Sequence, residues 1–150
     1  MREILFRAKR KNWLELPKEE WWVEGYPVKY QPCASKDEWI YGIVPTCASA
    51  LYIIEIDPET LCQYTGMVDK NGNRIWENDI VSAWSEGKYA TGMVKQRIDG
   101  LYIMYPAYQH NEFWGLCPDK NRKTNVEVIG NVFDNPELLK VQRKFSHQRE

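Results

Sequence analysis

The side chains best suited to nucleophilic or metal chemistry in this sequence are its cysteines and histidines. They are Cys33, Cys47, Cys62, Cys117, His110 and His147. No two cysteines are spaced as CxxC, and the histidines are too far apart for the His-x3–5-His spacing of a zinc site. Because no secretory leader is evident, we expect reduced and buried thiols, without disulfides, a metal or a cofactor.

The acidic pair Glu77 and Asp79 could do acid–base or metal chemistry. With one residue between them, both side chains would point to the same side of a strand and could share a metal or a proton. Asp and Glu beside a turn more often accept hydrogen bonds from backbone amides. A metal-dependent hydrolase is therefore the least favoured function, and we expect no enzyme.

Charge and composition limit the other functions. The chain has 150 residues with 20 basic and 21 acidic side chains, which argues against a globally basic nucleic-acid binder. No apolar run approaches the roughly 20 residues that cross a bilayer. We therefore expect a protein without a membrane segment, located in the cytoplasm and built as one domain or two packed subdomains.

A local basic surface remains the main alternative for function, because basic residues gather near both ends of the chain. The candidate nucleic-acid-binding residues are Arg2, Arg7, Lys9, Arg10, Lys11, Lys140, Arg143 and Lys144. Contacts of such residues to phosphate make affinity fall steeply with salt. Runs of this kind are more often a solvated face.

Aromatic residues are abundant, with 7 Trp, 9 Tyr and 4 Phe. Most of them are expected to fill a β-rich core, and the rest to bind a partner. The candidate partner-binding residues are Trp84, Tyr102, Tyr108, Phe113 and Trp114. Three of them lie in the segment 106–125, which has no clean periodicity and either packs as a flap or presents a binding edge.

Short apolar runs separated by Pro, Gly and Asn predict a mainly β protein. In the first part of the chain, strands are expected over 3–9, 21–31, 39–44 and 50–56, the last ended by Asp57-Pro58. Pro27 restricts the second strand to an edge or interrupts it. Later, Asn71-Gly72 predicts a hairpin with a tight primed turn.

The strands expected over 80–84, 92–98 and 101–105 have the spacing of a small SH3-like barrel, with glycine at a strand start and a tight Asp99-Gly100 turn. A final strand over 126–133 follows. Asn135 is then expected to cap a short helix that has Pro136 at its first position.

Several stretches together resemble one protein family. They are Arg2–Arg10, Trp22–Tyr30, Asp57–Val81 with Gln-Tyr-Thr-Gly and Asp-Lys-Asn-Gly, and Val126–Leu139 with Val-Ile-Gly-Asn and Asn-Pro-Glu-Leu-Leu. In this order they are similar to the YopX family of phage and prophage proteins. The family usually has glycine where this chain has Asn78, a residue that tolerates the left-handed conformation.

The resemblance implies a small, largely β protein encoded by a phage or prophage, acting in the bacterial cytoplasm, in a family without an established activity. We expect an N-terminal antiparallel β subdomain, residues 1–58, packed on an SH3-like barrel with a short C-terminal helix, residues 59–150. The favoured function is a non-enzymatic protein-interaction module. Its partner would be a host or phage protein, and self-association remains open.

Overall fold

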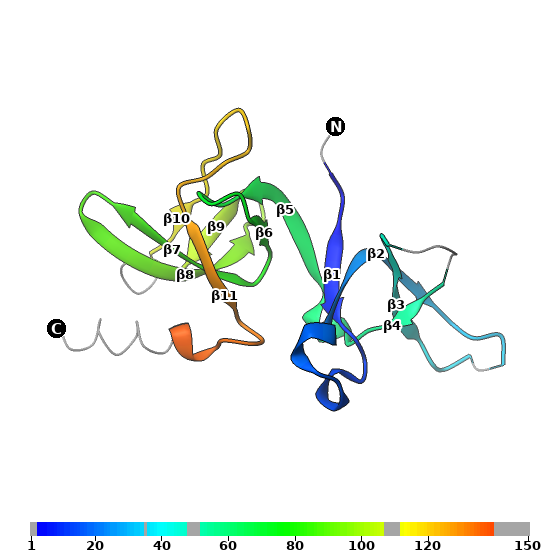
Figure 1. Ribbon diagram of the computed structural model, residues 1–150. Coiled ribbons are helices and arrows are strands. Elements are labelled where there is room, and N and C mark those ends of the chain that lie inside the picture. The colour runs from blue at the N-terminus through cyan, green and yellow to red at the C-terminus, as the bar shows by residue number, and fades with distance from the viewer. Residues whose placement is uncertain (1–2, 35, 48–51, 107–111, 140–150) are drawn as a thin grey trace. The chain divides into compact units, whose positions relative to one another are not determined.

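The computed structural model describes residues 3–34, 36–47, 52–106 and 112–139 (Figure 1). The chain forms two compact units, Met1–Gln63 and Tyr64–Glu150. The boundary lies inside strand β5 (Cys62–Val68), whereas the sequence suggested a division after residue 58. The protein is mainly β and its named strands all pair antiparallel, which confirms the expected fold class.

The N-terminal unit is a sheet in which neighbouring strands pair in the order β4-β3-β2-β1-β5. Its strands are β1 (Phe6–Lys9), β2 (Trp22–Tyr30), β3 (Ile40–Pro45) and β4 (Ile54–Glu55), followed by the first residues of β5. Two 3-10 turns, η1 (Trp13–Glu15) and η2 (Lys18–Glu20), connect β1 to β2. Ala8, Val23, Ile43 and Ile56 form its small apolar core.

Strand β2 accommodates Pro27 because its two partners pair with different parts of it. Strand β1 pairs with β2 only as far as Gly25, while Pro27 lies opposite Ile43 of β3. Pro27, which lacks an N–H donor, therefore lies in the part of β2 that pairs, within the described residues, with β3 alone. The expected constraint applies locally, although β2 runs without interruption to Tyr30.

A buried hydroxyl fixes the chain where it leaves β4. The turn η3 (Pro58–Thr60) is capped by Asp57, which accepts a hydrogen bond from the amide of Glu59. Thr60 Oγ1 accepts from the Lys9 amide at 2.8 Å and donates to the Asp57 carbonyl at 2.7 Å. Thr60 thus locks η3 to the end of β1.

The second unit contains a five-stranded sheet in the order β10-β9-β8-β7-β11. Its strands are β7 (Asp79–Ser85), β8 (Lys88–Gln96), β9 (Tyr102–Tyr105), β10 (Trp114–Gly115) and β11 (Glu127–Asn131). The buried core is Met67, Ile75, Val81, Ala83, Ala90, Val94, Tyr102, Met104, Leu116 and Val126. The expected three-stranded meander is present as β7, β8 and β9.

The expected barrel is an open sheet. Strands β10 and β11 are its two edges and do not pair with each other among the described residues. Between them the chain runs to β5, where Lys123 forms a parallel bridge with Val68. Strand β11 then joins the sheet beside β7, with Val128 opposite Val81, so the barrel does not close.

The hairpin of β5 and β6 (Arg74–Trp76) differs from the tight primed turn expected at Asn71-Gly72. Its loop is one residue longer: the Gly72 amide donates to the Asp69 carbonyl, and the Asp69 amide donates to the Asn73 carbonyl. Only Gly72 has a positive φ, at 86°, as in a type I turn followed by a left-handed glycine. The side chain of Asp69 supports this longer loop.

Two further local expectations have clear outcomes. Asn78 adopts φ 68°, so it occupies the left-handed position suited to glycine, as expected. The C-terminal helix is present at 137–139, at the end of the described residues. However, the Asn135 side chain accepts a hydrogen bond from the Asn131 amide, so it secures the end of β11 instead of capping the helix.

Candidate functional site

The N-terminal basic residues that the sequence assigned to nucleic-acid binding are each held by the protein itself. The Arg7 guanidinium lies 4.6 Å from the centre of the Trp22 ring, and Arg10 Nε donates to the Glu20 carbonyl. Lys11 Nζ pairs with Glu55 at 3.1 Å. Arg2, Lys140, Arg143 and Lys144 lie outside the described residues. The predicted surface as a whole therefore stays a prediction, and only its members Arg7, Lys9, Arg10 and Lys11 are placed by the structure.

Lys9 is the clearest departure from the predicted basic surface, because its side chain is only 1% exposed. The turns η1 and η2 fold back so that Lys9 Nζ lies 3.8 Å from the centre of the Trp13 ring and 4.3 Å from that of Trp21. A desolvated ammonium on aromatic faces is a stabilising cation–π arrangement. Lys9 is thus a core cation that external phosphate cannot reach.

The predicted partner-binding aromatics divide between surface and core. Trp84 is 65% exposed and lies 5.0 Å from the ring of Tyr89 on the β7–β8 hairpin. Phe113 is exposed beneath the Arg97 guanidinium, and the half-buried Trp114 packs on the core. Tyr102 is a buried core residue at the centre of the sheet, so it offers no contact surface. Tyr108 lies outside the described residues.

One member of the acidic pair, Asp79, closes a turn. Asp79 is buried, and its Oδ2 accepts a hydrogen bond from the Trp76 amide at 2.8 Å. This is the turn-closing role expected for an aspartate in that position. Among the described residues, no group of three or more His, Cys, Asp or Glu side chains could hold a metal ion.

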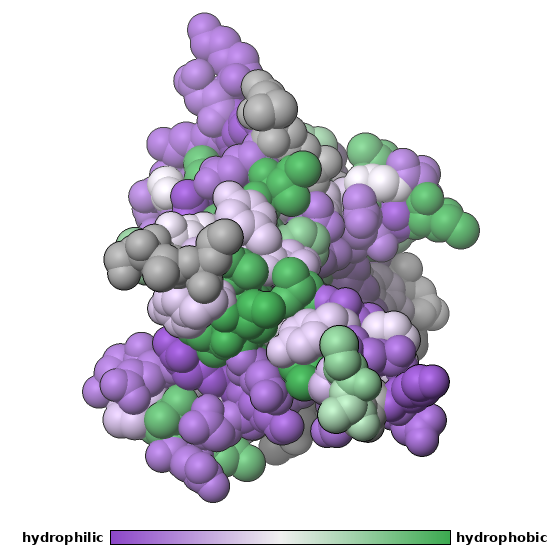
Figure 2. Space-filling view, turned by 90° about the vertical axis from the view of Figure 1, so that its right-hand side faces the viewer, coloured by the Kyte–Doolittle hydropathy of each residue, from purple (hydrophilic) through white to green (hydrophobic). Residues whose placement is uncertain are grey.

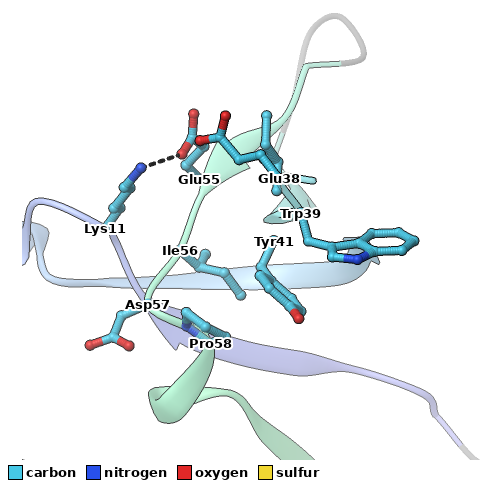
Figure 3. A pocket seen from close by; sticks show the side chains of 9 residues that line it. Lys11, Glu38, Trp39, Tyr41, Glu55, Ile56, Asp57 and Pro58 are labelled. Atoms are coloured by element: carbon cyan, nitrogen blue, oxygen red, sulfur yellow. Dashed lines mark hydrogen bonds and ion pairs between the residues drawn. The ribbon is translucent and has the colours of Figure 1, made fainter. Parts of the chain in front are cut away.

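A surface hollow in the N-terminal unit combines exposed aromatic rings with acidic groups (Figure 3). It has a volume of about 260 Å³. The lining residues are Lys11, Glu38, Trp39, Ile40, Tyr41, Glu55, Ile56, Asp57 and Pro58. They come from three stretches: Lys11 after β1, residues 38–41 at the start of β3, and residues 55–58 from β4 to η3. The pairing of β3 with β4 and the hydrogen bond from the Lys11 amide to the Glu55 carbonyl bring these stretches together.

The hollow carries more negative than positive charge. Its lining includes three acids, Glu38, Glu55 and Asp57, and one lysine, Lys11, which pairs with Glu55, while Lys29 lies on its rings. Asp57 is occupied by the Glu59 amide and by Trp13 Nε1 at 3.4 Å. Within the part of the chain that the structure describes, no cation pairs with Glu38. Its carboxylate therefore remains available to a cation from outside the hollow.

Trp39 supplies the aromatic surface of the hollow. Its side chain is about half exposed, at 49%, and in Figure 3 its ring points outward from the rim. Lys29 Nζ lies 4.4 Å from the centre of this ring and 5.4 Å from that of Tyr41. The rings at this position thus already attract a cation from the protein itself. The described lining residues of the hollow include no serine, threonine, cysteine or histidine.

Other exposed side chains lie on the face of β2, β3 and β4 opposite the one that carries Lys29 and Tyr41. Tyr26 and Tyr30 lie on this face of β2, and Ile53 packs against Gly42, where a Cβ atom would lie 2.3 Å from the Ile53 Cγ2 atom. Figure 2 turns the right-hand side of Figure 1 toward the viewer and shows green hydrophobic residues bordered by paler and purple ones. An apolar centre with a polar rim is the usual anatomy of a protein-binding surface.

Sequence reasoning missed this hollow because its members are spread over three separate stretches. One signal was available in the sequence: Glu38 and Trp39 directly precede β3, and Glu55 lies in β4, the strand that pairs with β3. Without the register of that pairing, the two acids cannot be placed at one site. The predictions therefore concentrated on aromatic residues of the second unit.

The family model described as YopX protein matches residues 6–140. This chain belongs to the YopX family. Among solved structures, this YopX-family chain is similar to the crystal structure of protein EF1440 from Enterococcus faecalis. The two chains are 20% identical, the match covers 93% of this chain and 99% of that one, and the TM-score is 0.44. The comparison with curated proteins finds no match. Among the described residues, no helix is long and apolar enough to cross a membrane.

Proposed function

We propose that this YopX-family protein is a non-enzymatic interaction module whose N-terminal unit docks a partner protein through the hollow of Figure 3. The observation that carries the proposal is that the exposed Trp39 ring and the Glu38 carboxylate both line this hollow. Tryptophan in a partly desolvated pocket is among the residue types that contribute most to binding energy. The partner supplies an arginine or lysine side chain.

A cationic side chain fits both features of the hollow. Its charged group would pair with Glu38, and its planar or aliphatic part would pack on Trp39 or Tyr41. The internal contact of Lys29 with the same two rings shows the geometry that such a contact takes.

The proposal includes the setting in which the module acts. We infer a phage or prophage gene product that works in the bacterial cytoplasm and has no catalytic step. The resemblance to phage proteins supports the phage or prophage origin. The hydrogen bond that the Asp79 carboxylate accepts from the Trp76 amide supports the lack of a catalytic step. The partner is a host or phage protein with an exposed basic segment. Pairing with a second copy of this chain is an alternative that the same experiment tests.

Affinity purification from the native host tests the proposal, with nuclease treatment in parallel. Trp39→Ala and Glu38→Lys are compared with Trp84→Ala, a matched control that removes another exposed tryptophan. We expect the first two variants to lose a nuclease-resistant partner and the control to retain it. Retention by both hollow variants, or loss only in Trp84→Ala, would show that the hollow does not dock the partner.

A further inference from the structure

Two loops of the second unit have almost the same sequence and the same internal structure. Residues 69–73 read Asp-Lys-Asn-Gly-Asn, and residues 119–123 read Asp-Lys-Asn-Arg-Lys. In each loop the aspartate Oδ1 accepts hydrogen bonds from the amides two and four residues later, at 2.9 and 2.8 Å in the first and 2.8 and 3.0 Å in the second. The amide three residues after each aspartate donates to that aspartate's carbonyl at 3.0 Å.

Backbone hydrogen bonds hold these two loops next to each other. The Val68 amide donates to the Arg122 carbonyl at 2.9 Å, and the Thr124 amide donates back to the Val68 carbonyl at 2.9 Å. The Lys70 amide donates to the Val126 carbonyl, also at 2.9 Å. In Figure 1 the second loop projects from the chain between β10 and β11. Together the loops form one rigid edge, which we call the twin-loop edge.

The twin-loop edge is rich in exposed cations. Its exposed basic residues are Lys70, Lys120, Arg122 and Lys123, and Arg74, directly after the first loop, lies on the Tyr64 ring. Three acids lie among these five cations, the buried Asp69, Asp119 and Glu127, and Glu127 pairs with Lys70 at 3.5 Å. The near-neutral charge of the whole chain therefore conceals a local excess of positive charge.

Arg122 occupies a backbone conformation that does not suit its side chain. Its φ is 64°, and the equivalent position of the first loop is Gly72, with φ 86°. Glycine adopts this conformation without steric cost, whereas other L-residues are strained in it. Strain that persists where a glycine would relieve it points to a use for the side chain. The guanidinium group is the feature that a glycine would not supply.

We propose that the twin-loop edge binds the phosphate backbone of nucleic acid. Arginine, lysine and asparagine are the side chains that most often contact phosphate, and the exposed Asn71 and Asn121 add amide donors beside the cations. Because both loops are braced by an aspartate, the cations are held along a fixed edge, which suits the regular phosphates of a polymer. This site is independent of the protein-docking hollow and uses none of the residues in the terminal basic clusters.

Fluorescence anisotropy of the full-length protein with a labelled DNA duplex tests this site. We expect binding that weakens as salt rises, and a loss of about one unit of salt slope for each phosphate contact removed. Arg122→Gly removes one cation while relieving backbone strain, so its fold is retained. One phosphate contact changes log K by about 0.9 for each tenfold change in salt, so between 1 M and 0.1 M salt it contributes a factor of roughly eight. The affinity of Arg122→Gly at about 0.1 M salt should therefore fall by this factor.

Lys88→Gln is the matched control, because it removes an exposed cation from the β7–β8 hairpin of the same unit. It should leave both affinity and salt slope nearly unchanged, whereas Lys120→Gln should behave like Arg122→Gly. The proposal is overturned by an absence of binding at low salt, or by equal losses in Lys88→Gln and Arg122→Gly. Competition by poly-glutamate as effective as that by unlabelled DNA would also overturn it, in favour of an acidic protein ligand.

Discussion

Asp69 is the residue on which the hairpin and the last strand of the second unit depend most. Its side chain is fully buried. Oδ1 accepts from the amides of Asn71 and Asn73, at 2.9 and 2.8 Å, and Oδ2 accepts from the amide of Val128 at 3.0 Å. One carboxylate therefore joins a hairpin loop to a strand that follows 59 residues later. We predict that Asp69→Asn strongly destabilises the second unit.

The magnitude follows from the atoms that change. In Asp69→Asn, Oδ1 can still accept from the two loop amides, but the new NH2 group faces the Val128 N–H, and two donors then meet. An unsatisfied buried amide costs about 1–3 kcal/mol, and the loss of charge assistance adds to it. We expect the free energy of unfolding to fall by about 3 kcal/mol. A urea titration followed by circular dichroism and tryptophan fluorescence measures this fall.

Asp119→Asn is the matched control, because Asp119 has the same bonds within its loop but is exposed. It keeps an acceptor for both amides, so a loss below about 1 kcal/mol is expected, as for a surface substitution. Amide hydrogen exchange should show lost protection at Val128 in Asp69→Asn alone. Equal destabilisation by the two substitutions would refute the role assigned to Oδ2 of Asp69.

The same carboxylate gives stability a pH dependence. Burial raises the pKa of Asp69. Hydrogen bonds from the amides of Val128, Asn73 and Asn71 and from the Asn73 side chain together lower it by more than burial raises it, so the pKa lies below its usual value. In the unfolded chain the pKa of Asp69 should be about 3.9. The contribution of Asp69 is therefore complete above that pH and is lost as pH falls through the lowered folded pKa. Asp69→Asn should show a flatter decline in stability over this acidic range.

Three further substitutions test separate parts of the fold by urea titration. Thr60→Val should cost about 2 kcal/mol, because it leaves the buried Lys9 amide unsatisfied, whereas Thr60→Ser keeps the hydroxyl and should cost less. Gly25→Ala should cost about 3 kcal/mol or prevent folding, because its Cβ would lie 2.0 Å from the Val44 carbonyl oxygen; a cost below about 0.5 kcal/mol, as expected for Gly115→Ala in open space, would contradict this. Arg122→Gly should stabilise by about 1 kcal/mol, and a loss of stability would show that its positive φ is unstrained.

Local signals in the sequence were read correctly where a short stretch fixes its own conformation. The left-handed Asn78 and the meander around 80–105 depend on neighbours or on an alternating pattern. The barrel was predicted from the same meander, and it failed because closure depends on where the chain between β10 and β11 goes. That path is set by the bridge of Lys123 to Val68, which the alternation of apolar residues does not encode.

The binding site was harder to predict because charge in a sequence says nothing about its partners in space. Lys9 belongs to a basic run, but the turns that follow β1 fold Trp13 and Trp21 over it. Conversely, Glu38 belongs to no acidic run and lies at the rim of the hollow only through the pairing of β3 with β4. The repeated Asp-Lys-Asn pattern of the twin-loop edge was visible in the sequence, but its juxtaposition was not.

An NMR titration of the 15N-labelled protein with an arginine–glycine peptide tests whether the acid-lined hollow receives a cationic side chain of a partner protein. A glutamate–glycine peptide is the control. We predict saturable shifts of the Trp39 indole N–H and the Glu38 amide with the basic peptide, while the Trp84 indole N–H stays in place. Unchanged Trp39 and Glu38 signals, or equal shifts with the acidic peptide, would contradict it.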